Sequence, residues 1–151
     1  MEFELKSDSA EETIEIGLKI GAQLKGGEVI GLIGPLGSGK THLIKGIAAG
    51  AGAVDDARAV NSPTFVIINE YQGRLNIYHI DAYRLNSTAE FEMLGFDDYC
   101  NRDSVVLVEW ADKVLPALDG VNLISVKLSH LAQNDRGVNI SNAPEYLIKG
   151  L

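Results

Sequence analysis

The chain has 151 residues, of which 46% are hydrophobic and 23% are charged, a composition typical of a globular domain and not of a disordered chain. Its formal net charge is −8 and its arginines are scattered, which argues against a protein that binds nucleic acid on its own through clustered cations. The sequence has no apolar run long enough to span a membrane, no signal-peptide pattern and a single cysteine. We therefore expect a soluble, cytoplasmic protein without an internal disulfide.

A first helix is expected over Thr13–Leu24. The preceding residues, Ser9 to Glu12, fit a capping box in which the serine hydroxyl accepts from the backbone and the glutamate reaches back. Gly26-Gly27 would end the helix. Because the stretch Ile14–Leu18 also alternates, a strand is the alternative there. On a helix, one face would carry Ile14, Gly17, Leu18 and Gly21.

The central part of the chain predicts two buried strands and a hairpin. Val29–Ile33 and Ser104–Glu109 are short and almost continuously apolar, as expected for strands that are covered on both faces. Phe65–Tyr71 and Leu75–Asp81 favour an antiparallel hairpin that turns at residues 72–74.

The remaining pattern completes one domain, with no element predicted beyond Pro144. A helix is expected at His42–Ala49, followed by a loop of small residues at Gly50–Ala59. A capped short helix is expected at Ser87–Met93, and two late strands at Asn122–Leu128 and Arg136–Ser141. Residues 1–151 are therefore expected to form a single α/β domain, with a mixed parallel and antiparallel sheet flanked by helices.

A phosphate-binding loop is the most specific motif in the sequence. The pattern G-x-x-x-x-G-K-[ST] is matched by Gly34, Pro35, Leu36, Gly37, Ser38, Gly39, Lys40 and Thr41. Glycines let backbone N–H groups converge on phosphate oxygens, and the following helix points its positive end at the same anion. Lys40 would reach the β- and γ-phosphates, and the Thr41 hydroxyl would hold Mg²⁺. Because the N-K-x-D pattern that reads guanine is missing, we expect ATP and not GTP.

Two acidic residues are candidates to complete a metal site, since Mg²⁺ takes oxygen ligands and needs only one or two carboxylates. Glu109 ends the buried strand Ser104–Glu109, the usual place of a Walker B acid, and a solvated strand end is the alternative. Asp81 ends a strand that is only half buried, and it could instead be a structural partner of Arg84 or His79. We expect Thr41, Glu109 and Asp81 to be the metal ligands, with one acid acting directly and the other through water.

Four further residues have weaker patterns. Thr64, in Ser62-Pro63-Thr64, could belong to a switch that senses Mg²⁺ and the γ-phosphate, or could follow a proline that starts a strand. Arg84 could stabilise phosphate charge or form a structural ion pair. Trp110 could pack at a partner surface or in the core, and His79 has no partner at the spacing of a hydrolase triad or a metal cluster.

Several short motifs occur together in one order. These are the loop, Ser62-Pro63-Thr64-Phe65, residues 79–85 (H-I-D-A-Y-R-L), residues 92–96 (E-M-L-G-F) and Val108-Glu109-Trp110. Together they resemble the TsaE family, also called YjeE, of small bacterial P-loop ATPases required for threonylcarbamoyl-adenosine modification of tRNA next to the anticodon. The resemblance covers roughly residues 9–136.

The resemblance implies a mixed-sheet P-loop fold, ATP and Mg²⁺ as ligands, and the proteins TsaD and TsaB as partners. In that family the partners carry out the transfer to tRNA while the ATPase drives or resets the complex. The implied roles are phosphate binding for Lys40, Mg²⁺ binding for Thr41 and Glu109, and hydrolysis or switching for Asp81 and Thr64.

Two residues of the loop depart from the family pattern. An acidic residue usually stands where this chain has Pro35, and a second threonine where it has His42. The residue after the Mg²⁺ threonine commonly touches the α-phosphate, so His42 is expected beside the nucleotide although its contact differs. The alternatives to an ATPase subunit are a small-molecule P-loop kinase and a nucleotide-gated scaffold with negligible hydrolysis.

Overall fold

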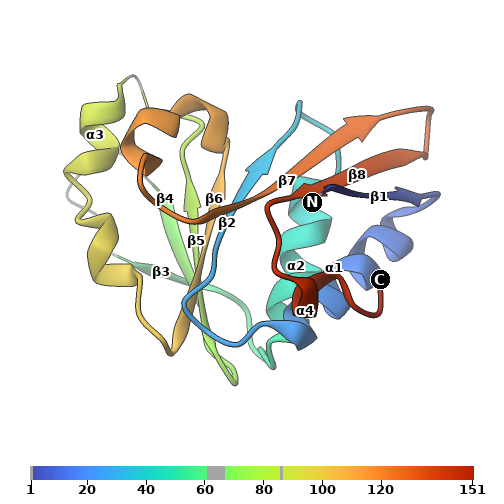
Figure 1. The fold of residues 1–151 in the computed structure, drawn as a ribbon, viewed down its shortest axis with the longest axis horizontal. Helices are drawn as coiled ribbons and strands as arrows, with labels where there is room; N and C mark the ends of the chain where they lie inside the picture. The colour runs from blue at the N-terminus through green and yellow to red at the C-terminus, as the bar shows by residue number, and fades with distance from the viewer. Residues whose placement is uncertain (1, 61–66, 86) are drawn as a thin grey trace.

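The strands of this protein form one mixed sheet with helices on both faces. The computed structural model describes residues 2–60, 67–85 and 87–151. Within these residues the sheet has eight strands in the order β1-β8-β7-β2-β6-β5-β4-β3 (Figure 1). The expected α/β class with a mixed sheet is confirmed. The strands are β1 Glu2–Ser7, β2 Val29–Ile33, β3 Arg58–Val60, β4 Ile67–Tyr71, β5 Asn76–Asp81, β6 Ser104–Glu109, β7 Leu123–His130 and β8 Arg136–Ser141.

Four adjacent strands at the centre of the sheet are parallel. β2 pairs in parallel with β6 on one side and with β7 on the other, and β5 pairs in parallel with β6. The flanking pairs, β1 with β8, β7 with β8, β4 with β5 and β3 with β4, are antiparallel. The predicted hairpin of residues 67–81 is thus confirmed for the residues described, and the central strands β2 and β6 have the predicted bounds.

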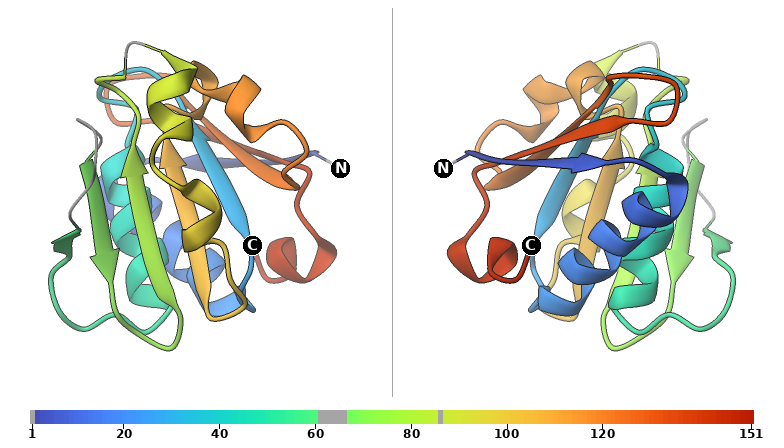
Figure 2. Two further views of the ribbon diagram at one scale, coloured as in Figure 1. Left: turned by 90° about the vertical axis from the view of Figure 1, so that its left-hand side faces the viewer. Right: turned by 90° about the vertical axis from the view of Figure 1, so that its right-hand side faces the viewer.

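The helices divide between the two faces (Figure 2). α1 Ala10–Gln23, α2 Lys40–Gly50 and α4 Glu145–Ile148 cover one face, and α3 Thr88–Glu92 lies on the other with three short 3₁₀ turns. The turns are η1 Phe96–Tyr99, η2 Ala111–Lys113 and η3 Leu115–Leu118. The serine half of both capping boxes is confirmed, since Ser9 Oγ accepts from Glu12 N at 3.1 Å and Ser87 Oγ accepts from Glu90 N at 3.4 Å.

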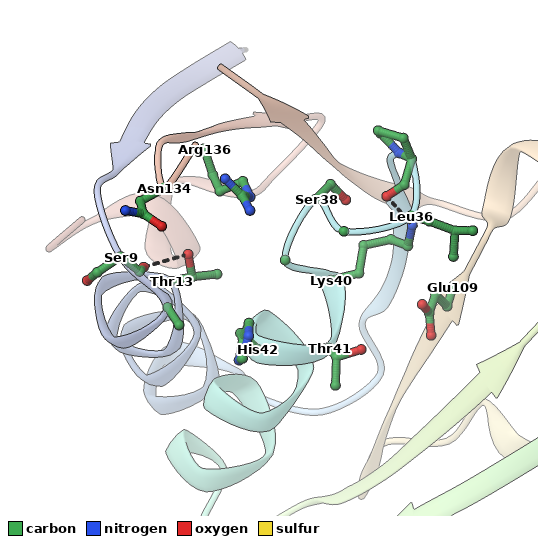
Figure 3. Close-up of a pocket in the computed structure, with 14 residues that line it drawn as sticks. Ser9, Thr13, Leu36, Ser38, Lys40, Thr41, His42, Glu109, Asn134 and Arg136 are labelled. Atoms are coloured by element: carbon green, nitrogen blue, oxygen red, sulfur yellow. Dashed lines mark hydrogen bonds between the residues drawn. The ribbon is translucent and has the colours of Figure 1, made fainter. Parts of the chain in front are cut away.

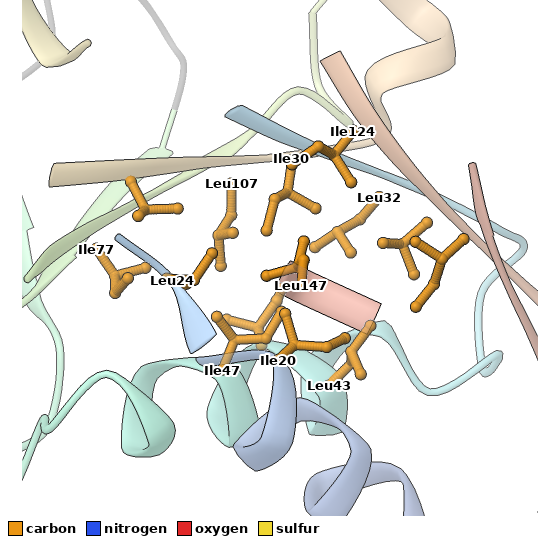
Figure 4. Close-up of a cluster of buried hydrophobic side chains, with 14 of the residues drawn as sticks. Ile20, Leu24, Ile30, Leu32, Leu43, Ile47, Ile77, Leu107, Ile124 and Leu147 are labelled. Atoms are coloured by element: carbon orange, nitrogen blue, oxygen red, sulfur yellow. The ribbon is translucent and has the colours of Figure 1, made fainter. Parts of the chain in front are cut away.

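Two hydrophobic cores follow from the alternation of side chains along the central strands. On β6, Val105 and Leu107 face the core beneath α1 and α2, whereas Val106 and Val108 face the core beneath α3. All four are buried, because this strand is covered on both faces. Figure 4 shows the first core, in which Ile20 of α1 and the α2 side chains lie opposite the apolar residues of the strands.

Several elements were not predicted or differ from their predicted form. β1 has no prediction from the sequence, β3 occupies the end of the expected loop Gly50–Ala59, and α4 lies in the tail. The predicted buried face of α1 is wrong in part: Leu18 is 40% exposed, and Thr13 and Ile20 are buried beside the two glycines of that face. The reason is that α1 faces another helix along its glycines, and this turns Leu18 to the solvent.

The contact between α1 and α2 is made backbone to backbone. A Cβ atom at Gly17 would lie 2.5 Å from the carbonyl oxygen of Leu43 and 2.9 Å from the Cα of Gly46. A Cβ at Gly46 would overlap the carbonyl oxygen of Ile14, and Gly21 and Gly50 meet in the same way one turn further on. Only glycine fits at such a contact, so these residues set the distance between the helices.

We predict that Gly46→Ala destabilises the protein by about 1 to 3 kcal/mol, although alanine is the better helix former by about 1 kcal/mol. The added methyl group has to push against the backbone of α1, which cannot rotate away as a side chain can. Urea denaturation would measure the loss. Lys45→Ala, at an exposed position of the same helix, is the control and should change stability by less than about 0.5 kcal/mol. Equal stability of the Gly46→Ala variant and the wild type would contradict this packing.

Candidate functional site

The predicted site residues meet at the carboxyl edge of the parallel strands. In the β2–β6 ladder Leu32 is opposite Glu109, and in the β5–β6 ladder Asp81 is opposite Glu109. The glycine-rich loop begins at Gly34, directly after β2, so it starts beside Glu109, with Asp81 one strand further away. This edge is the usual place for a ligand in an open α/β sheet.

The loop has the backbone form that phosphate binding requires. Gly37 and Gly39 have φ values of 79° and 100°, in the left-handed region that other residues avoid. A Cβ at Gly34 would lie 2.7 Å from the carbonyl oxygen of Leu128, so the start of the loop also needs glycine. Gly39 caps α2 without a side chain, which leaves the first N–H groups of the helix directed at the loop.

A cavity of about 270 Å³ lies over this loop. Residues 35–42 form its floor, with Glu109 at one end, and Figure 3 shows Ser9, Asn134 and Arg136 on the side of α1. Among the described residues, Ser38 Oγ and His42 Nδ1 are buried without a hydrogen-bond partner, and both residues line this cavity. Buried polar atoms without a partner are rare, and a polar ligand in the cavity would satisfy them.

The ammonium group of Lys40 is held by groups of its own protein. Lys40 is 5% exposed, and its Nζ donates to the carbonyl oxygens of Gly34 and, at 3.1 Å, Pro35. The same Nζ lies 3.8 Å from the ring centre of Trp110, a cation–π contact. Burial lowers the pKa of this lysine, and the negative charges of Glu109, Asp112 and Asp81 offset part of that effect. Carbonyls and a ring face attract a cation without neutralising it, so the charge remains available to an anion.

Trp110 is fixed in an unusual backbone conformation. Its φ is 62°, which is strained for a bulky residue, and its N–H donates to the carbonyl oxygen of Leu32 at 3.0 Å. The half-buried ring packs on Tyr83, with ring centres 4.9 Å apart, and Lys113 donates to the carbonyl oxygen of Tyr83. From the sequence, Trp110 could pack either at a partner surface or in the core. In the structure its ring contacts both Lys40 of the loop and Tyr83, which is 43% exposed.

The two acids at the edge have different partners. Glu109 Oε1 lies 2.8 Å from His79 Nε2, and Asp81 Oδ1 accepts from the backbone N–H of Tyr83 at 3.0 Å. The sequence offered His79 or Arg84 as a partner of Asp81, and the histidine pairs with Glu109 instead. The partner of His79 is thus a carboxylate that the sequence did not assign to it. Arg84 itself is exposed.

Sequence reasoning missed the residues at the other end of the cavity. Arg136 and Asn134 lie at the turn between β7 and β8, and Ser9 and Thr13 lie at the start of α1. The Arg136 guanidinium donates to the carbonyl oxygens of its own turn, which holds the side chain in place. No local motif marks these residues as part of a ligand site, because the pairing of β1 with β8 brings them to the loop. Thr64 lies outside the described residues, so its predicted role stays a prediction.

Comparison with known families agrees with this arrangement. The sequence profile of the family described as "Threonylcarbamoyl adenosine biosynthesis protein TsaE" matches residues 7–138. The chain belongs to the TsaE family. The match begins at the last residue of β1 and extends into β8, so it includes the loop, both acids and Arg136.

Individual relatives cover most of the chain. The tRNA threonylcarbamoyladenosine biosynthesis protein TsaE of Treponema pallidum is 34% identical, over 89% of this chain and 97% of its own length. TsaE of Haemophilus influenzae is 38% identical, over 74% of this chain and 75% of its own. The crystal structure of YdiB from Bacillus subtilis superposes with a TM-score of 0.74 at 28% identity, covering 93% of this chain and 84% of that one. As a member of this family, the protein takes part in the biosynthesis of threonylcarbamoyladenosine in tRNA.

We predict that Lys40 and Trp110 are energetically coupled by about 1 to 2 kcal/mol, because the ammonium is desolvated against the ring. The measurement is a double-mutant cycle of Lys40→Met and Trp110→Leu, followed by urea denaturation. A control cycle pairs Trp110→Leu with Lys45→Met, which is exposed on the same helix and should show a coupling near zero. A coupling of the Lys40 pair below about 0.3 kcal/mol would contradict the contact.

Proposed function

We propose that this chain is an ATP-binding, Mg²⁺-dependent ATPase that drives or resets a complex of the TsaD and TsaB proteins during threonylcarbamoyl modification of tRNA. The cavity over the glycine-rich loop carries the proposal. It combines a buried but unneutralised lysine, Lys40, with two buried polar atoms that lack partners, and it has Glu109 at its edge. This combination suits a polyanion that arrives with a metal ion.

ATP suits the chemistry of the residues that line the cavity. Lys40 and the N–H groups at the start of α2 would bind the β- and γ-phosphates, as in other P-loops. The polar groups at the far end, Ser9, Asn134 and Arg136, would contact the rest of the nucleotide. His42 lines the cavity between these ends with its Nδ1 unpartnered, so it would take the place of the family's usual threonine.

Mg²⁺ would bind together with the nucleotide. Thr41 and Glu109 both line the cavity, and Asp81 is opposite Glu109 in the neighbouring strand. Among the described residues, no group of three or more His, Cys, Asp or Glu side chains is placed to hold a metal ion by itself. Mg²⁺ commonly uses one or two carboxylates and completes its shell with phosphate oxygens and water, so this sparse set fits it. When bound, the ion would neutralise charge on the phosphate oxygens.

The isolated chain is expected to hydrolyse ATP slowly. Phosphoryl transfer needs a positioned water and charge neutralisation, and an arginine supplied from outside can be worth roughly 10³ to 10⁵ in rate. In the described part of the chain, the arginine that lines the cavity, Arg136, lies at the end away from Glu109 and bonds its own turn. A partner would then complete the site. The net charge of −8 favours a basic docking surface on that partner. We expect a protein of tRNA modification to act in the cytoplasm.

We predict that Lys40→Ala weakens ATP binding by roughly 2 to 4 kcal/mol, because the change removes a desolvated positive charge from the phosphate site. Isothermal titration calorimetry would measure the affinity, with circular dichroism to verify the fold. Lys45→Ala, on the solvent side of α2, is the matched control and should bind ATP as the wild type does. Unchanged ATP affinity in Lys40→Ala would rule out the proposed phosphate site.

We also predict that steady-state ATP turnover rises at least tenfold when the TsaD and TsaB proteins are added, and that the rise is smaller at high salt. The measurement is phosphate release by the chain alone and in the mixture, at two salt concentrations. The Lys40→Ala variant in the same mixture gives the background. Equal turnover with and without partners, in a preparation that forms the complex, would contradict the proposed role. Transfer of phosphate to a small molecule would favour the kinase alternative.

A further inference from the structure

His79 and Glu109 form a short hydrogen bond between two mostly buried side chains, unlike a contact between mobile surface residues. The two residues come from adjacent parallel strands, β5 and β6, and both side chains are 13% exposed. Nε2 of the histidine lies 2.8 Å from Oε1 of the glutamate. An ionised carboxylate only accepts hydrogen bonds, so Nε2 carries the proton and donates it. The bond occupies Oε1, and within the described residues Oε2 accepts no hydrogen bond.

The position of Lys40 shows what the bond between His79 and Glu109 prevents. Lys40 and Glu109 line the same cavity, and the negative charge of Glu109 acts on the lysine. Opposite charges on side chains as little exposed as these attract more strongly than in water, and a direct salt bridge between them would neutralise the groups needed for phosphate and for metal. Within the described residues Glu109 instead makes its hydrogen bond with His79, and Lys40 binds the Gly34 and Pro35 carbonyls and the Trp110 ring.

We propose that His79 is a positioning residue that holds the carboxylate of Glu109 away from Lys40 and presents Oε2 to the Mg²⁺ of the bound nucleotide. The inference rests on the proposed function, because it assigns a task within that site. The terminal torsion of a glutamate is broad, so without His79 the carboxylate would turn freely. Partners of this kind, behind a ligand, typically change metal affinity about 10- to 100-fold when they are removed.

The neighbouring acid is held in a different way. Asp81 has one carboxylate oxygen bonded to the backbone N–H of Tyr83, a bond that no side-chain substitution at residue 79 removes. Changing His79 should therefore affect the contribution of Glu109 and leave that of Asp81 in place. This separation makes the histidine testable by itself.

The experiment measures the apparent affinity for Mg²⁺ by calorimetry, with MgCl₂ titrated into full-length protein saturated with ADP. ADP avoids turnover, and ADP binding without Mg²⁺ is measured in parallel. The variants are His79→Ala, His79→Gln and Glu109→Gln. His130→Ala, at an exposed position near the end of β7, is the control for loss of a histidine. Circular dichroism verifies that each variant is folded.

We expect His79→Ala to lower the Mg²⁺ affinity by 10- to 100-fold, approaching the loss in Glu109→Gln, and to leave Mg²⁺-free ADP binding within about twofold of the wild type. His79→Gln should regain part of the affinity, because its side-chain N–H can donate to the same oxygen. His130→Ala should change nothing.

Two results would overturn the inference alone: wild-type Mg²⁺ affinity in both His79 variants, or an equal loss of ADP binding with and without Mg²⁺, which would indicate a merely structural role. If the wild-type protein binds no ADP, the proposed function itself is wrong and the inference falls with it. The outcomes for the proposed function and for His79 are thus distinguishable.

Discussion

The parallel pairing of β2 with β6 is the constraint on which the site depends. It places the end of β2, where the glycine-rich loop begins, beside the end of β6, where Glu109 stands. The same strand β6 then sets Asp81 through its pairing with β5. A shift of this register by one residue would turn Glu109 to the other face and would exchange the two cores, because alternate residues of β6 are buried on opposite sides. The same strand register therefore determines both the packing of the two cores and the geometry of the site.

The second constraint is the contact between α1 and α2. The glycines of the two helices bring the backbones together, so α1 is fixed relative to the helix that begins at Lys40. The N-terminal end of α1 then reaches the cavity, where Ser9 and Thr13 line the wall opposite Glu109. The Cγ2 of Thr13 would lie 3.6 Å from a Cβ at Gly39, close to the phosphate loop. Packing far from the loop thus decides which side chains surround a ligand.

The sequence predicts those parts of the molecule whose signal is local. The loop and the starts of both capped helices are predicted because their residues interact with near neighbours in the chain. β6 is predicted because its continuous apolar run is visible in the sequence itself. β1 is missed because it is an edge strand that only its pairing with β8 stabilises. The exposure of Leu18 and the His79–Glu109 bond are missed for the same reason, since each depends on a partner distant in sequence. Arg136 was expected only as the start of a strand, and tertiary pairing adds its place in the cavity.

The cavity keeps two opposite charges close together and leaves both available. Lys40 is stabilised by carbonyl dipoles and an aromatic face, and Glu109 by an imidazole N–H, so neither charge is neutralised by the other. Keeping two mostly buried charges unpaired costs free energy, and the arrangement persists because the strands and the helix that carry the charges are firmly packed. A ligand that carries both an anionic and a cationic group can pair with Lys40 and with Glu109 at the same time. A polyphosphate with a bound divalent ion has this character, whereas a bare anion would satisfy Lys40 and repel Glu109. The charge pattern thus favours the metal complex of a nucleotide over the free nucleotide.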